Sequence, residues 1–440
     1  MVHDHLIQRS GVNNWTSKHD RKSNLDRMWL IKWSMRLTGI WPYDLVGKYS
    51  TMWFMFTCLN WFSLVWMGFA MCSFMYRYMN DIIVVIDTIC TYSTNVICMV
   101  KMTWIIYKRQ LFHELIDIVL SNRLLEINPL LEWNRGIPSS YAQKLQKFTI
   151  KIFDKNWKEY RIVSRIFCTM VIVTALSYAS IPLIIMAYMK FTSGIVPRHH
   201  IYNADYSVLS IEVSQTPFYE TSLTHETFVG LIIYSVVVGL DVIYCFFTMY
   251  LRDQLRILQQ MLKMIDEEID EPFKQKKIIE CADERLMKCV RHHTTIISFQ
   301  NKLEVAYGPV TLFQTVLSSI LICVIAFRSS ISTTDLTNLL IKIPYLLAAI
   351  VQLLLYSYYG QAVINESTEL ATSLYETHWY EYSKSFRSSL LIIFPQIQRP
   401  LHLSGMGFIV MSLDSFKAIL STAMSYFTLL QSITEPAKKN

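Results

Sequence analysis

Long apolar stretches, separated by polar and charged segments, set the pattern of this chain of 440 residues. A membrane-spanning helix needs about 20 consecutive, mostly apolar residues, and stretches of that length recur to the end of the sequence. They predict seven spanning helices, at 51–75, 82–107, 161–189, 228–251, 306–328, 338–360 and 407–433. The expected fold is therefore an all-α membrane protein with seven transmembrane helices.

Three of the polar segments are also compatible with helix. Residues 1–50 form a basic arm, and within it 25–41 mixes tryptophan with lysine and arginine, as helices in the membrane interface do. We expect 25–41 to lie on the membrane surface or to re-enter it, with an ordinary packing helix as the alternative. Residues 252–305 should extend the spanning helices into the cytoplasm, and a short helix at 383–398 should precede the last span.

The composition agrees with a membrane protein and disfavours a nucleotide-binding enzyme. Apolar residues make up 52% of the chain and charged residues 17%, against about 25% in soluble domains. The mean hydropathy is +0.28. Only 12 glycines and 12 prolines leave little room for phosphate-binding loops or flexible linkers. The nine cysteines form no legible disulfide framework.

The net charge of +7 is less informative than its distribution. With seven spans, about 30 of the lysines and arginines in the connecting segments fall on one side and about 6 on the other, and the richer side is cytoplasmic. This bias predicts an N-terminus in the cytoplasm and a C-terminus outside the cell. The orientation is opposite to that of a G-protein-coupled receptor.

Catalytic motifs are missing from the sequence. We find no nucleophile elbow, P-loop or zinc-protease helix motif. We therefore expect no enzyme activity, no cofactor, no metal site and no nucleic-acid partner, and we expect membrane lipid to surround the chain.

Ionisable residues inside the predicted spans are more informative, because a charge in lipid is costly unless it faces protein or water. We expect these residues to form ion pairs or to face an aqueous path. They are Asp87, Lys101, Asp241, Lys342 and the neighbours Asp414 and Lys417.

The last span carries a polar stripe. At 100° per residue, Thr422 and Ser425 lie within about 40° of Leu429, Asp414 lies within about 60°, and Ile433 adds a second aliphatic residue at the end. A stripe of small and polar residues has two interpretations: close packing between helices or the lining of an aqueous pore. The stripe alone leaves both open.

The same region resembles the C-terminal signature of insect odorant receptors. The resemblance is carried by PLHLSG at 400–405, MSLDSF at 411–416 and SYFTLLQ at 425–431. Weaker matches are GIWP at 39–42 and YGQ at 359–361. The resemblance runs along essentially the whole chain.

This resemblance implies a multi-pass protein of the plasma membrane that forms ligand-gated, non-selective cation channels. The family assembles a variable odorant-binding subunit with an obligate co-receptor in a tetramer, and its last span lines the central pore. Leu429 and Ile433 match its hydrophobic gate, Thr422 and Ser425 would line the pore, and Asp414 would favour cations. The segment 108–160 lacks the co-receptor's long insertion, so this chain resembles the variable subunits.

In the family, the odorant site lies among the outer halves of spans two, three, four and six, with help from span five. Apolar and aromatic walls there suit a small volatile molecule. The residues that the resemblance places in this site are Tyr92, Ser177, Tyr178, Ile181, Met186, Tyr234, Val238, Ile343 and Tyr345.

Two other functions stay open at this point. A gustatory receptor would be a homotetrameric channel of the same architecture, although 425–433 departs from its usual ending. A G-protein-coupled receptor would need the opposite orientation. A transporter is disfavoured because the chain shows no internal repeat or paired broken helices.

Overall fold

A computed structural model describes residues 24–47, 49–122, 124, 140–193, 200–206, 216–265, 274–331 and 336–437. Within these ranges, six helices are long and apolar enough to cross a membrane. They are α5 (Ser50–Arg77), α6 (Ile82–Tyr107), α8 (Ser140–Ser193), α9 (Phe218–Lys263), α10 (Lys274–Ile331) and α11 (Leu336–Tyr375). Each contains or nearly coincides with one of the first six apolar stretches of the sequence.

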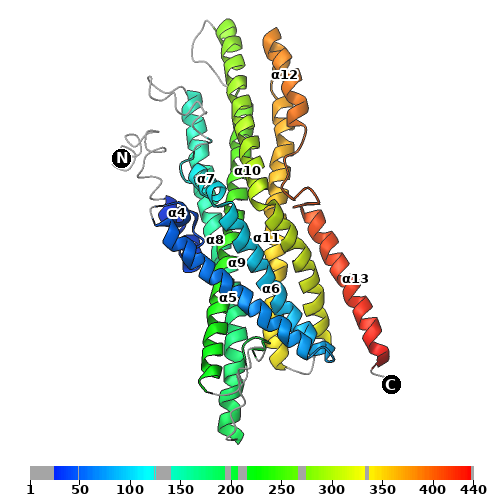
Figure 1. Ribbon diagram of the computed structural model, residues 1–440. Coiled ribbons are helices and arrows are strands. Elements are labelled where there is room, and N and C mark those ends of the chain that lie inside the picture. Colours follow the sequence, from blue (N-terminus) through cyan, green and yellow to red (C-terminus); the bar gives the residue numbers. More distant parts are fainter. Residues whose placement is uncertain are drawn as a thin grey trace.

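Four of these helices continue well beyond one membrane thickness. At 1.5 Å per residue, the 58 residues of α10 span about 87 Å, whereas the hydrocarbon core of a bilayer is about 30 Å thick. Figure 1 shows α8, α9, α10 and α11 extending past the ends of α5 and α6 at the top of the view. The helical extension expected at 252–305 is present on both sides of its break, because α9 continues to Lys263 and α10 begins at Lys274.

Helix α9 lies at the centre of the bundle. It packs against α8, α10, α11, α6 and the N-terminal helix α3 (Trp29–Leu37). Its residues from Val238 to Gln254 are all buried, as expected for a helix that is surrounded by protein. The polar Asp241 is among them, so α9 brings a carboxylate into the middle of the bundle.

The basic N-terminal segment forms α3 and the short helix α4 (Pro42–Val46). One face of α3 packs closely on α9, where a Cβ built on Gly239 would lie 2.6 Å from the Cγ of Met35. Trp33 on another face is 59% exposed. This arrangement has features of both alternatives, a packing helix and an interfacial one, and a position in the membrane interface stays a prediction.

Shorter elements complete the chain. The predicted helix at 383–398 is present as α12. The shorter elements are α7 (Arg109–Leu120), a 3-10 turn (Trp379–Glu381), α12 (Lys384–Ile397), β1 (Ser404–Gly405), β2 (Ile409–Val410) and α13 (Leu413–Ala437).

The start of the last predicted span, at 407, was wrong by six residues. An antiparallel hairpin of β1 and β2 occupies this stretch, and Gly407 has a φ of +79°, a left-handed conformation that favours glycine. Helix α13 therefore begins only at Leu413. The hairpin is also the one departure from an all-helical fold among the described residues.

Candidate ligand-binding cavity

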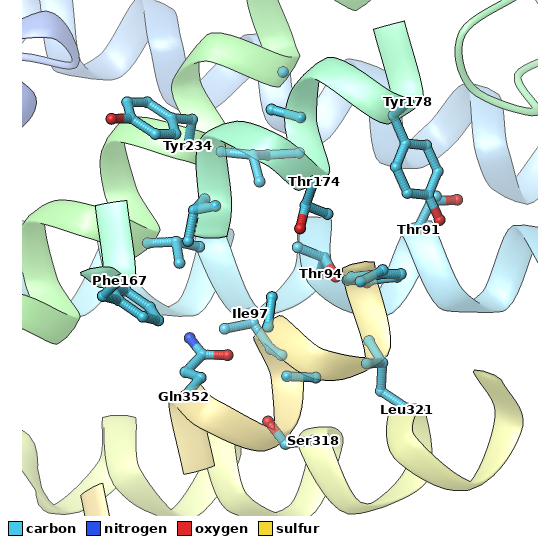
Figure 2. A pocket seen from close by; sticks show the side chains of 18 of the residues that line it. Thr91, Thr94, Ile97, Phe167, Thr174, Tyr178, Tyr234, Ser318, Leu321 and Gln352 are labelled. Atoms are coloured by element: carbon cyan, nitrogen blue, oxygen red, sulfur yellow. Dashed lines mark hydrogen bonds between the residues drawn. The ribbon is translucent and has the colours of Figure 1, made fainter. Parts of the chain in front are cut away.

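A cavity of about 120 Å³ lies inside the bundle. Helices α6, α8, α9, α10 and α11 all contribute to its walls, and most of the lining side chains are apolar or aromatic (Figure 2). An apolar cavity of about 150 Å³ holds a benzene-sized molecule, so this volume suits a small organic ligand. The polar or aromatic residues of the lining are Thr91, Thr94, Phe167, Thr174, Tyr178, Tyr202, Tyr234, Gln314, Ser318, Tyr345 and Gln352.

Three tyrosines form one end of the cavity. The ring of Tyr178 meets Tyr345 edge-on, with centroids 5.7 Å apart, and stacks near Tyr202 at 6.4 Å. The Tyr345 hydroxyl donates to the Cys90 carbonyl at 3.0 Å and also bonds to Thr94. The buried hydroxyl of Tyr178 has no hydrogen-bond partner in the part of the chain that the structure describes.

Residues 200–206, the described middle of the segment between α8 and α9, contribute Tyr202 to this end, and we call them the cover loop. The side chain of Glu226 on α9 is fully buried and accepts hydrogen bonds from the backbone N–H groups of Ile201 at 2.8 Å and Tyr202 at 3.3 Å. It also pairs with His200 Nδ1 at 2.9 Å. One buried carboxylate thus fixes the backbone that places Tyr202 beside the cavity.

A buried ion pair lies beyond the other end. Lys101 Nζ of α6 and Asp241 Oδ1 of α9 are 2.5 Å apart, and both side chains are 1% exposed. The hydroxyl of Tyr356 donates to the same carboxylate at 2.7 Å, and Gln352 Nε2 donates to its second oxygen. Gln352 in turn accepts from Gln314 at 3.1 Å. This network joins four helices.

Other charges in the predicted spans are paired as well. Asp87 of α6 binds both Arg328 of α10 and Lys342 of α11 at 3.0 Å. Asp414 and Lys417 form an exposed pair within α13 at 3.5 Å. The expectation of ion pairs inside the bundle is met, and the charges tie α6 to α9, α10 and α11.

Three residues that the sequence suggested for ligand binding line the cavity: Tyr178, Tyr234 and Tyr345. Two others do not line the cavity: Val238 is buried in the hydrophobic core of the bundle, and Ile343 is 46% exposed on the outside of α11. Tyr92, Ser177 and Met186 are not among the lining residues, and the side chain of Ile181 lies outside the described residues.

Few features of the sequence point to the residues at the end of the cavity nearest the Lys101–Asp241 pair, which we call the inner end. Gln314 and Ser318 are four residues apart on α10, and Tyr345 and Gln352 are seven apart on α11, so each pair shares one helix face. The recurrence of polar residues on one face of an otherwise apolar span is the sequence pattern from which these lining residues could have been predicted.

The polar stripe of α13 faces away from the bundle. Asp414, Thr422 and Ser425 are exposed, and Leu429 is 55% exposed. Another face of α13 packs against α10 and α11, and its Ala423 is buried in a cluster with residues of these helices. The side chain of Ile433 lies outside the described residues. In Figure 1 the C-terminal half of α13 diverges from the other helices.

The fold and the cavity together define a helical membrane protein with a mostly apolar cavity between its helices. Comparisons with known proteins point to one class of membrane protein. Odorant receptor 13a of Drosophila melanogaster is 24% identical over 426 residues, covering 91% of this chain and 94% of the relative. An odorant receptor coreceptor of Anopheles gambiae is 28% identical over 142 residues, which cover 32% of this chain and 30% of that protein.

A solved structure shares the fold. The insect olfactory receptor OR5 from Machilis hrabei in complex with eugenol superposes with a TM-score of 0.74 at 17% identity, over 94% of this chain and 100% of that one. The 7tm Odorant receptor family model matches residues 81–424. This chain therefore belongs to the 7tm odorant receptor family, which is a receptor family and not an enzyme family.

Proposed function

We propose that this chain is the odorant-binding subunit of a non-selective cation channel in the plasma membrane, and that a small volatile molecule in the cavity opens it. The observation that carries the proposal is the cavity of about 120 Å³ with aromatic and apolar walls, found in a chain of the odorant receptor family. Burial of apolar surface stabilises such a complex by about 25 cal/mol per Å², so a volatile ligand needs few directional bonds.

The chain is oriented with its N-terminus in the cytoplasm and its C-terminus outside. The distribution of lysine and arginine supports this orientation, as does the placement of α4 and the end of α13 towards opposite ends of the bundle in Figure 1. An epitope tag at residue 1 should stain only permeabilised cells. Staining of intact cells would instead favour a G-protein-coupled receptor.

The partner is the obligate odorant co-receptor, in a heterotetramer. The similarity to receptor 13a covers 94% of that protein, whereas the similarity to the coreceptor covers 30%, which favours the variable subunit. Co-expression with the co-receptor should give odorant-evoked current. Current from this chain alone would favour a homotetramer of the gustatory type.

Gating is a shift between two populations. In the closed state, Leu429 and Ile433 of the four subunits form a dry constriction that excludes hydrated cations. A ligand favours the open state only by its difference in affinity between the two states. Thr422 and Ser425 line the pore, and Asp414 attracts cations near its cytoplasmic end.

Substitution of Leu429 tests the gate. Leu429→Ser should raise the ligand-independent current of the assembled channel, because it wets the constriction. Met424 is a matched control, since it is 58% exposed on another face of α13, and Met424→Ser should leave the basal current unchanged. Equal basal currents in wild type and Leu429→Ser would count against the gate.

A further inference from the structure

The orientation of two buried glutamines is set by the carboxylate beyond the inner end of the cavity. Asp241 is paired with Lys101, and its carboxylate accepts hydrogen bonds without donating any. Gln352 therefore turns its Nε2 towards Asp241. Its Oε1 is then left to accept from the Nε2 of Gln314 at 3.1 Å.

This orientation leaves one buried acceptor unused. The Nε2 of Gln314 donates to Ser318 Oγ at 2.7 Å as well as to Gln352, so both of its N–H groups are occupied. The Oε1 of Gln314 has no hydrogen-bond partner among the residues that the structure describes, although Gln314 is only 2% exposed. Leaving a buried carbonyl unpaired is unfavourable, and such a group in a native protein calls for an explanation.

The unused acceptor belongs to the cavity wall. Gln314, Ser318 and Gln352 all line the cavity, and Figure 2 shows Ser318 and Gln352 across the cavity from Tyr178. We propose that the ligand of this cavity is a small alcohol or phenol whose O–H donates to the Oε1 of Gln314. This inference rests on the proposed function, because it names the chemical class of the odorant.

Other volatile classes fit this end less well. Ketones, esters and ethers carry only acceptors, so they leave the Gln314 Oε1 unpaired and bond instead to cavity donors such as the hydroxyl of Tyr178. Hydrocarbons satisfy neither group. Carboxylate and ammonium ligands bring a net charge to this end of the cavity, where the charges of Lys101 and Asp241 already neutralise each other.

The test compares ligands that differ in this one group. Cells that co-express the full chain and the co-receptor are exposed to 1-phenylethanol and acetophenone, and to cyclohexanol and cyclohexanone. The alcohol of a pair should have an EC50 about tenfold lower than the ketone, because only the alcohol pairs the buried carbonyl of Gln314. Gln314→Leu should remove this preference mainly by weakening the response to the alcohol, and Gln314→Met, which is closer in shape, should act in the same way.

Tyr178→Phe is the matched control. It removes the Tyr178 hydroxyl, which also lacks a hydrogen-bond partner among the described residues, and should leave the preference for the alcohol intact. Equal EC50 values in the wild type, or a preference that persists in both Gln314 variants, would overturn the inference while the channel function stands.

A binding measurement separates the two proposals. The same compounds are added to the complex purified in detergent, and its thermal stability is recorded. If no compound evokes current but the alcohols alone stabilise the wild type, and not the Gln314 variants, the ligand class stands and the channel proposal falls. If alcohols and ketones have equal effects or none in both assays, the ligand class is refuted.

Discussion

Replacement of Asp241 by asparagine should strongly destabilise the protein. The substitution keeps the size of the side chain but leaves the ammonium group of Lys101, 1% exposed, without its counter-charge. Breaking a buried ion pair by removing one partner costs about 3–5 kcal/mol, because the remaining charge stays buried. Tyr356 and Gln352 also lose a charged acceptor.

The loss of stability in Asp241→Asn can be expressed as a decrease in melting temperature. An unfolding entropy of about 2.1 cal/mol/K per residue corresponds to about 0.9 kcal/mol/K for this chain of 440 residues. A loss of about 3–5 kcal/mol then lowers the midpoint by about 3–5 °C. The assay is fluorescence-detected size exclusion of the detergent-solubilised complex after heating.

A double-mutant cycle tests the cause. Lys101→Met and Asp241→Leu should each be more destabilising than the double variant, because an apolar pair of similar volume can replace a buried ion pair. Asp414→Asn is the control, since its pair with Lys417 is exposed and should contribute little. Additive effects of the two substitutions, or an Asp241→Asn midpoint equal to that of the wild type, would refute the reasoning.

Three further predictions concern other parts of the molecule. Gly360→Ala should abolish the monodisperse complex in size exclusion, because the new Cβ would lie 2.1 Å from the Met411 carbonyl oxygen; Gly68→Ala, with its nearest neighbour at 3.8 Å, should be tolerated. Glu226→Gln should loosen the cover loop and raise the EC50 of every activating odorant about tenfold, because hydrogen bonds to a charged group contribute about 1.5–3 kcal/mol. Burial lowers the pKa of His292, in the part of α10 that precedes the predicted span, to about 4; thermal stability should therefore fall as pH drops from about 6.5 towards that value, and His292→Leu should flatten the dependence.

The spans were predictable because length and apolarity decide them almost alone. The stretch at 82–107 coincides with α6, and the charged residues inside the spans were expected to pair, as Lys101 and Asp241 do. These properties are local or follow from the cost of a charge in lipid. The partner of each charge was not predictable, since the pairing joins helices far apart in the sequence.

The cavity lining was harder to predict because it depends on the rotation of each helix about its own axis. Tyr345 lines the cavity, whereas Ile343, two residues earlier and about 200° away, is exposed on the outside of α11. The role of Tyr202 in the cover loop was not predicted for another reason. Its backbone N–H donates to Glu226, 24 residues away in the sequence, and no local sequence pattern indicates such a contact. The hairpin before α13 likewise depends on its packing against α10.

The hydroxyl groups on the outer face of α13 determine how this face can tolerate lipid before a subunit assembles with others. Thr422 donates to the carbonyl of Ala418 at 2.8 Å, and Ser425 donates to that of Ser421 at 3.0 Å, so both hydroxyl hydrogens are already occupied within the helix. The face of α13 that we propose lines the pore can therefore contact lipid chains in an unassembled subunit, because these hydroxyl groups need no acceptor outside the helix.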